Sequence, residues 1–156
     1  MFTRSDQPIT PSRIRAYAME LLARREYAAQ ELHKKLVTKF DGSELIEVVL
    51  KELQADNLQC DQRFAESFVR SRINRGHGPM RISREIGQRG INTELLQQAY
   101  AQCQPDWFEL ARELRLRRFP VVGDDNKLRA KVQRFLSYRG FGYDQIRFAM
   151  EQNESE

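Results

Sequence analysis

The sequence predicts an all-α protein: three tandem three-helix repeats that form an elongated, curved array. Apolar residues recur at helical spacing, and no run of four to eight residues alternates as a strand should. The chain also repeats at a spacing of fifty residues, as repeat arrays do. Residues 82–100 fall on residues 132–150 without a gap, which pairs Gly90 with Gly140, two glycines placed to end helices. Units of about 45 residues are small for independent stability, so we expect them to share core across their junctions.

The first repeat is expected over residues 10–58. Thr10 caps its first helix, and Pro11 takes the first helical position, where a missing N–H costs nothing. The chain breaks at residues 41–42, and Ser43 caps the third helix. The expected apolar stripes are Ile14, Tyr17, Ala18, Leu21 and Leu22, then Leu32, Leu36 and Val37, then Leu45, Ile46, Val49, Leu50 and Leu53.

The second repeat is expected over residues 59–104, with Asp61 as the cap of its first helix. A turn at residues 76–79 separates the first two helices, and Asn92 or Thr93 caps the third. The expected stripes are Phe64, Ala65, Phe68, Val69 and Ile73, then Ile82 and Ile86, then Leu95, Leu96, Ala99 and Tyr100.

The third repeat is expected over residues 105–152, with Asp106 as its first cap. Its first turn is enlarged to a loop over residues 119–127. The adjacent carboxylates Asp124 and Asp125 precede a helix, where capping and the helix dipole explain them better than Mg²⁺ does. The expected stripes are Trp107, Phe108, Ala111 and Leu114, then Leu128, Val132, Phe135 and Leu136, then Ile146, Ala149 and Met150.

The composition is that of a globular chain, with 40% hydrophobic and 31% charged residues. No stretch reaches the roughly 18 unbroken apolar residues that a membrane span needs. Residues 1–14 lack the apolar core of a signal peptide, and Cys60 and Cys103 lie far apart without a partner motif. We therefore expect a cytoplasmic protein with reduced, buried cysteines and no membrane association. Residues 1–9 and 153–156 are expected to be flexible.

The sequence offers little catalytic chemistry. The Gly76-x-Gly78 pair follows a helix and not a strand, so it is interpreted as a turn and not as a nucleotide loop. Zinc ligands usually come in tight pairs, and the two histidines and two cysteines form none. We therefore expect no catalytic residues, no metal and no cofactor, and a protein that is not an enzyme.

Positive charge is concentrated in the second and third repeats. Residues 1–62 hold 9 basic and 10 acidic side chains, whereas residues 63–90 hold 7 and 2, and residues 112–139 hold 9 and 3. This asymmetry favours a polyanion or an acidic protein surface as partner, although arginine-rich helices can also be merely solvated.

The candidate partner-binding residues lie on the second helices and the helix ends of these two repeats. Arginine outnumbers lysine among them, which suits bidentate contact with phosphates or carboxylates. Phe135 and Phe141 continue the apolar pattern, whereas Tyr138 is expected to be exposed, where it could stack on an unpaired base. Arg89 and Arg139 precede helix-ending glycines and could equally satisfy the last carbonyls. The candidates are Arg72, Arg75, Arg81, Arg84, Arg89, Lys127, Lys131, Arg134, Tyr138 and Arg139.

Three ordered segments resemble the signatures of the RecX family of RecA regulators. They are residues 72–91, residues 131–141 and residues 31–36. Family members often begin the second helix with a serine cap, whereas this chain has Ala28 and Ala29, so this helix start is less well defined.

The resemblance implies a protein that binds the filament of RecA on single-stranded DNA, along its groove, and restrains RecA's ATPase, strand-exchange and co-protease activities. It thereby implies a role in recombination, DNA repair and the SOS response, and it supplies no catalytic residues. We expect a monomer whose partners are the RecA filament and single-stranded DNA, with double-stranded DNA a further candidate. The alternative is a stand-alone helix-turn-helix-like DNA-binding protein, which the lack of a polar base-reading helix disfavours.

Overall fold

A computed structural model describes residues 7–151 and confirms the all-α repeat fold. The expected flexible ends, residues 1–9 and 153–156, lie mostly outside the described range. Within that range there are nine helices and no strand. The helices are α1 (Pro11–Arg24), α2 (Ala29–Lys39), α3 (Leu45–Ala55), α4 (Asp61–Asn74), α5 (Pro79–Gly87), α6 (Thr93–Cys103), α7 (Trp107–Arg118), α8 (Asn126–Tyr138) and α9 (Tyr143–Met150).

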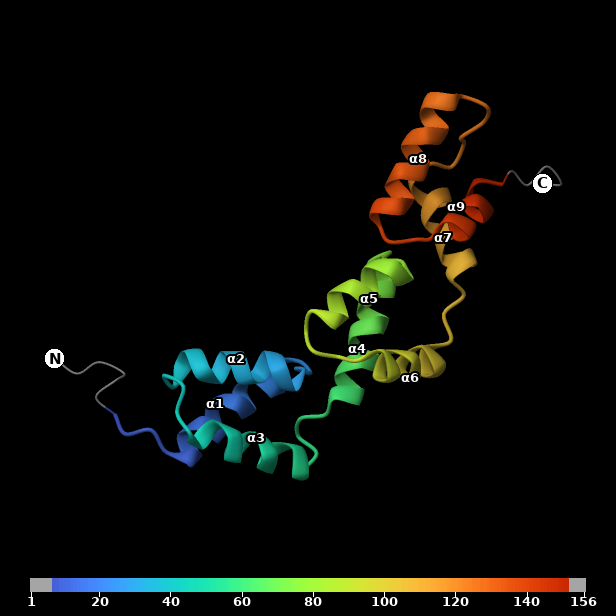
Figure 1. Ribbon diagram of the computed structural model, residues 1–156. Helices are drawn as coiled ribbons and strands as arrows, with labels where there is room; N and C mark the ends of the chain where they lie inside the picture. Colours follow the sequence, from blue (N-terminus) through green and yellow to red (C-terminus); the bar gives the residue numbers. More distant parts are fainter. Residues whose placement is uncertain (1–6, 152–156) are drawn as a thin grey trace.

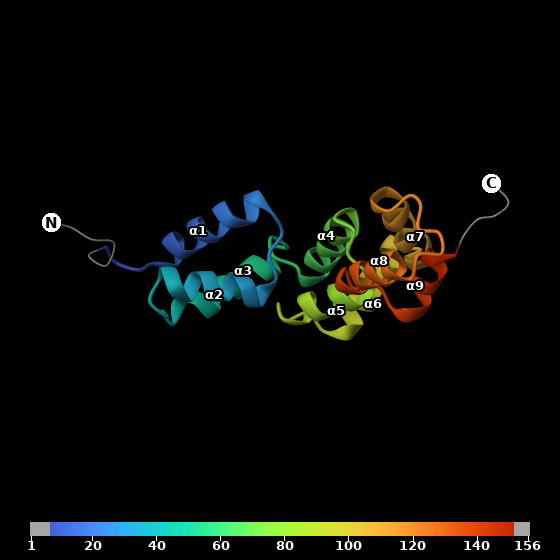
Figure 2. The same cartoon turned by 90° about the horizontal axis from the view of Figure 1, so that it is seen from above.

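The helices form three units in a row: repeat 1 (α1–α3), repeat 2 (α4–α6) and repeat 3 (α7–α9) (Figure 1). In each unit the first and third helices pack most extensively, and the second helix lies against them. The array is elongated, with α1 and α9 at opposite ends (Figure 2). It also bends, because repeat 3 rises away from the line of repeats 1 and 2 (Figure 1).

Each repeat has its own apolar core. The three clusters are centred on Ile14, Leu32 and Leu53, on Phe64, Ile82 and Ile86, and on Ala111, Val132 and Leu136. The expected sharing of core is limited to two side chains: Ala28 of repeat 1 belongs to the second cluster, and Trp107 packs on the second and third. Hydrogen bonds and ion pairs also cross both junctions.

Several predicted helix starts are confirmed. Thr10, Asn92, Asp106 and Asp125 accept hydrogen bonds from backbone N–H groups in the first turns of α1, α6, α7 and α8. The hydroxyl of Ser43 accepts from the N–H of Leu45 at 3.2 Å.

Other expectations need correction. Val37 and Phe108 are expected in apolar stripes, but both side chains are exposed. Cys60 and Cys103 are free but half-buried instead of fully buried.

Asp61 does not cap its own helix. Its Oδ1 accepts from the N–H of Ala29, in repeat 1, at 2.8 Å, and from Gln59 Nε2 at 3.0 Å. The start of α2, which lacks a serine, is therefore capped from the next repeat. The Glu31 carboxylate also accepts from the N–H of Ala28 at 3.0 Å, so both alanine N–H groups have partners.

Candidate functional site

The junction between repeats 1 and 2 contains a small basic pocket, here called the junction pocket. Its volume is about 300 Å³. Side chains from both repeats line it: Arg25, Glu26, Phe64, Ser67, Phe68, Ser71, Arg72, Arg75 and Arg89. Three sequence-predicted residues, Arg72, Arg75 and Arg89, therefore meet here.

Phe68 organises two of these arginines. The guanidinium of Arg72 lies 4.4 Å from the centroid of the Phe68 ring, and that of Arg89 lies 4.9 Å from it. Cation–π attraction holds both charges beside an aromatic side chain that is itself buried. The arginines are thus positioned before any partner arrives.

The positive charge of the pocket is incompletely neutralised. Glu31 pairs with both Arg25 and Arg89 at 3.3 Å, and Glu26 pairs with Arg63 at 3.1 Å. Among residues 7–151, Arg72 and Arg75 form no ion pair. Burial lowers the pKa of Arg72; the charge of Glu85 opposes this, and the neighbouring arginines add to it. Such a site favours an anion.

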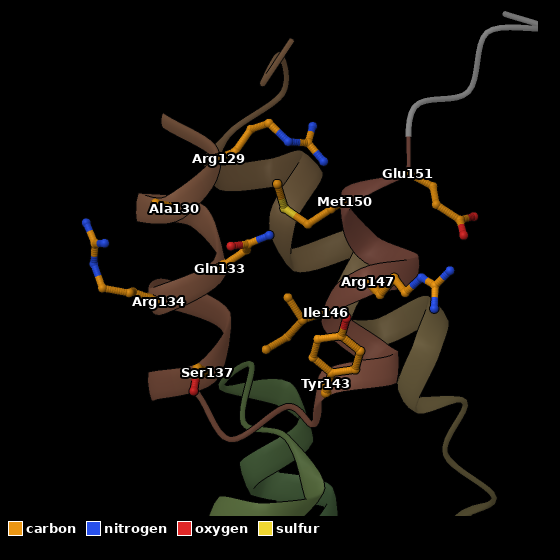
Figure 3. A pocket seen from close by; sticks show the side chains of 10 residues that line it. All are labelled: Arg129, Ala130, Gln133, Arg134, Ser137, Tyr143, Ile146, Arg147, Met150 and Glu151. Carbon is orange, nitrogen blue, oxygen red and sulfur yellow. The ribbon is translucent and has the colours of Figure 1, made fainter. Parts of the chain in front are cut away.

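The junction between repeats 2 and 3 is built on backbone contacts. The N–H of Gly78 donates to the carbonyl of Arg139 at 2.7 Å, and that of Met80 donates to Gly140 at 2.9 Å. This close approach requires glycine: a Cβ on Gly140, whose φ is +101°, would lie 2.3 Å from the Cβ of Arg81. Repeat 2 therefore contacts the α8–α9 loop directly (Figure 3).

Arg139 and Arg89 occupy equivalent positions and serve equivalent junctions. Arg139 Nη1 donates to the carbonyl of Arg75 at 2.9 Å, whereas Arg89 pairs with Glu31. Each therefore reaches the preceding repeat. Arg139 is expected from the sequence either to contact a partner or to bond the last carbonyls of its own helix. It does bond a carbonyl at a helix end, but that carbonyl belongs to α4 and not to α8.

Arg81 is also engaged within the chain. Its Nε pairs with Glu85 at 2.9 Å, and its guanidinium lies 5.4 Å from the centroid of Tyr138 in repeat 3. Tyr138 is 75% exposed, so one Arg81 contact leaves most of the ring accessible.

His77 is buried beside this group, with Nδ1 3.8 Å from Glu85 and no hydrogen bond at that atom. Burial lowers the pKa of His77, Arg81 adds to this and Glu85 opposes it.

The remaining candidates lie on α5 and α8, and all four are exposed: Arg84, Lys127, Lys131 and Arg134. Arg134 stands at the rim of a groove of about 660 Å³ between α8 and α9, and its side chain points away from the groove (Figure 3). Gln133, Ile146 and the exposed Tyr143 also line the groove (Figure 3).

The predicted site lacks three basic residues that line these two pockets. Arg25 lies in the junction pocket, and Arg129 and Arg147 line the groove between α8 and α9. The fifty-residue period contained the signal for Arg25, because it corresponds to Arg75 in the next repeat. The ten predicted residues thus divide among the junction pocket, the junction of repeats 2 and 3, and the surface of helices α5 and α8.

The part of the chain that the structure describes holds no grouping of three or more His, Cys, Asp or Glu side chains that could bind a metal ion. Nor does it contain a helix with the length and apolar character to span a membrane.

Comparisons with known proteins agree with this architecture. Residues 61–99 match the family model described as RecX, second three-helix domain, and residues 104–150 match that of RecX, third three-helix domain. Relatives named regulatory protein RecX share 44% identity over 94% of both chains in Chromohalobacter salexigens, and 42% over 88% of both in Pseudomonas putida strain W619.

Two solved structures are similar in fold. A crystal structure of regulatory protein RecX matches with a TM-score of 0.76 at 26% identity, covering 91% of this chain and 73% of that one. RecX from Lactobacillus salivarius matches with a TM-score of 0.70 at 23% identity, covering 90% and 94%.

Proposed function

Because the chain belongs to the RecX family of regulatory proteins, we propose that it binds the RecA–single-stranded DNA filament and inhibits RecA ATPase, strand exchange and co-protease activities. It would thereby modulate recombination, DNA repair and the SOS response in the cytoplasm. The observation that carries the proposal is the match of two successive repeats to RecX domains. The action is non-covalent: a monomer bridges neighbouring RecA protomers and biases the filament.

The geometry supports a division of labour among nine of the ten candidates; the tenth, Arg72, lines the junction pocket. Arg75, Arg84, Lys127, Lys131, Arg134 and Tyr138 are exposed and form no ion pair among residues 7–151, so they are the proposed contacts. Arg81, Arg89 and Arg139 hold the junctions and act as positioning residues. An elongated array with such contacts on successive repeats can follow a groove in a large partner.

RecA-dependent ATP hydrolysis on single-stranded DNA, titrated with this protein, tests the proposal. Inhibition should occur at concentrations far below those that bind naked DNA. If hydrolysis falls only in proportion to occupancy of free DNA, single- or double-stranded, the protein is a stand-alone DNA-binding protein and the filament proposal is wrong.

A further inference from the structure

We propose that the junction pocket binds a backbone phosphate of single-stranded nucleic acid and thereby bridges repeats 1 and 2. This inference rests on the proposed function for its partner. The first argument is charge: four arginines line the pocket, and the neighbouring carboxylates are already committed to Arg25, Arg63, Arg81 and Arg89. Arg72 and Arg75 thus form no ion pair among the described residues, and only the more distant charge of Glu85, which is paired with Arg81, acts on Arg72.

The second argument is donor geometry. Arg72 and Arg75 come from the end of α4, Arg25 follows α1, and Arg89 follows α5. The hydroxyls of Ser67 and Ser71 add two donors on the same wall. A carboxylate has two coplanar oxygens, which one arginine fork can satisfy, whereas a phosphate group accepts from several directions. Donors that converge from several helix ends therefore match a phosphate better than a carboxylate.

The third argument is preorganisation. Phe68 fixes two guanidinium groups, so little side-chain freedom remains to be lost when an anion enters. Phe68 is buried, which makes it a support for the arginines and not a platform for base stacking. The pocket is accordingly expected to bind the backbone without sequence preference.

Because the junction pocket lies between repeats 1 and 2, an anion bound there would affect how the two repeats are oriented. Arg25 belongs to repeat 1, and Arg72 and Arg75 belong to repeat 2. A phosphate held by all three would favour one orientation of the two repeats, because the anion screens the repulsion between these arginines.

The direct test is a titration with inorganic phosphate at constant ionic strength, followed by NMR of the arginine Nε–H groups. Arg72 and Arg75 should shift saturably. An oligonucleotide of single-stranded DNA without terminal phosphates should displace the inorganic phosphate and shift the same groups. Saturation by inorganic phosphate without displacement would mean a free-phosphate site and overturn the nucleic-acid assignment. The absence of saturable shifts would overturn the site itself.

Matched variants test specificity for the pocket. Arg72→Gln and Arg75→Gln each remove one charge, as does Arg70→Gln, which changes an exposed arginine of the same helix outside the pocket. The pocket variants should weaken oligonucleotide binding about tenfold. They should also reduce the salt slope by about 0.7 per lost phosphate contact, the value for single strands. Equal losses in all three variants would show that bulk charge is responsible and overturn the proposal.

A parallel RecA ATPase assay separates the two proposals. If the unmodified protein fails to inhibit, the proposed function is wrong, and the phosphate titration still decides the pocket. If Arg72→Gln and Arg75→Gln lose inhibition but keep full oligonucleotide affinity, the pocket binds an acidic protein group, and the phosphate assignment is wrong. Arg75 is exposed, and its side chain forms no ion pair among residues 7–151. Arg75→Gln therefore remains informative if Arg72→Gln lowers stability.

Discussion

At the scale of single residues, arginine serves two opposite purposes: some arginines bond carbonyls within the fold, and others remain exposed for a partner. Arg115 is buried and donates through Nε to the carbonyl of Ala149 at 2.8 Å, and Arg139 donates to the carbonyl of Arg75. Arg84 and Arg134 are exposed. Charge alone therefore does not identify a binding residue, because arginine is also the side chain that can reach an orphan carbonyl across a junction.

Gly140 allows the backbones of repeats 2 and 3 to meet, so Gly140→Ala should separate them. We expect a loss of about 3 kcal/mol in the free energy of unfolding, from left-handed strain and the clash with Arg81. The control is Gly42→Ala, where φ is +66° but no atom lies within 4 Å; it should cost about 1 kcal/mol. Urea denaturation measures both. Equal losses would mean that the close approach is unimportant.

His77 should make stability depend on pH. Its pKa is lowered in the folded state, so the unfolded chain binds the proton more readily. Its contribution is therefore complete above the unfolded pKa of about 6.5 and is lost as the pH falls toward the folded pKa. His77→Gln should flatten the loss of unfolding free energy between about pH 7 and 5.5.

The reference for this pH dependence is the slope of unfolding free energy against pH in the unmodified protein. An unchanged slope in His77→Gln would show that burial of this imidazole does not control the pH response.

At the scale of the elements, each helix was predictable where its caps are local. Thr10, Asn92, Asp106 and Asp125 each bond N–H groups two or three residues away, so sequence pattern contains the whole interaction. The cap of α2 was missed because Asp61 lies 32 residues from Ala29. Proximity of this kind arises only after the repeats have docked.

Removing this long-range cap should affect repeat 1 from a position in repeat 2. Asp61→Ala should cost about 1–2 kcal/mol and speed hydrogen exchange at the Ala29 amide, because that N–H and Gln59 lose an acceptor. Asp144→Ala, an exposed carboxylate in the first turn of α9, should cost only a few tenths of a kcal/mol. Unchanged exchange at Ala29 would contradict the cross-repeat cap.

At the scale of the whole molecule, the repeats share a framework but differ in surface charge. Lys34, Arg84 and Arg134 occupy equivalent, exposed positions on α2, α5 and α8. The charge asymmetry predicts that repeats 2 and 3 make the principal ionic contacts, and these three positions allow a matched comparison between repeats.

Charge reversal at these positions tests that asymmetry. Arg84→Glu and Arg134→Glu should each weaken inhibition of RecA ATPase more than Lys34→Glu, while unfolding free energies change by no more than about 0.5 kcal/mol. Equal effects at all three positions would place repeat 1 in the ionic interface as well. Arg81 is unsuitable for this test, because its contacts with Glu85 and Tyr138 make it part of the junction.

The sequence by itself determined the helices, the three-repeat plan and the family, because apolar spacing, local caps and signature motifs act over a few residues or at a fixed period. Only the tertiary structure decided which arginines remain available. Glu31 faces Arg89, Asp61 faces Ala29, and Arg139 reaches the end of α4. These contacts join residues 32–64 positions apart, so they depend on how one repeat docks on the next.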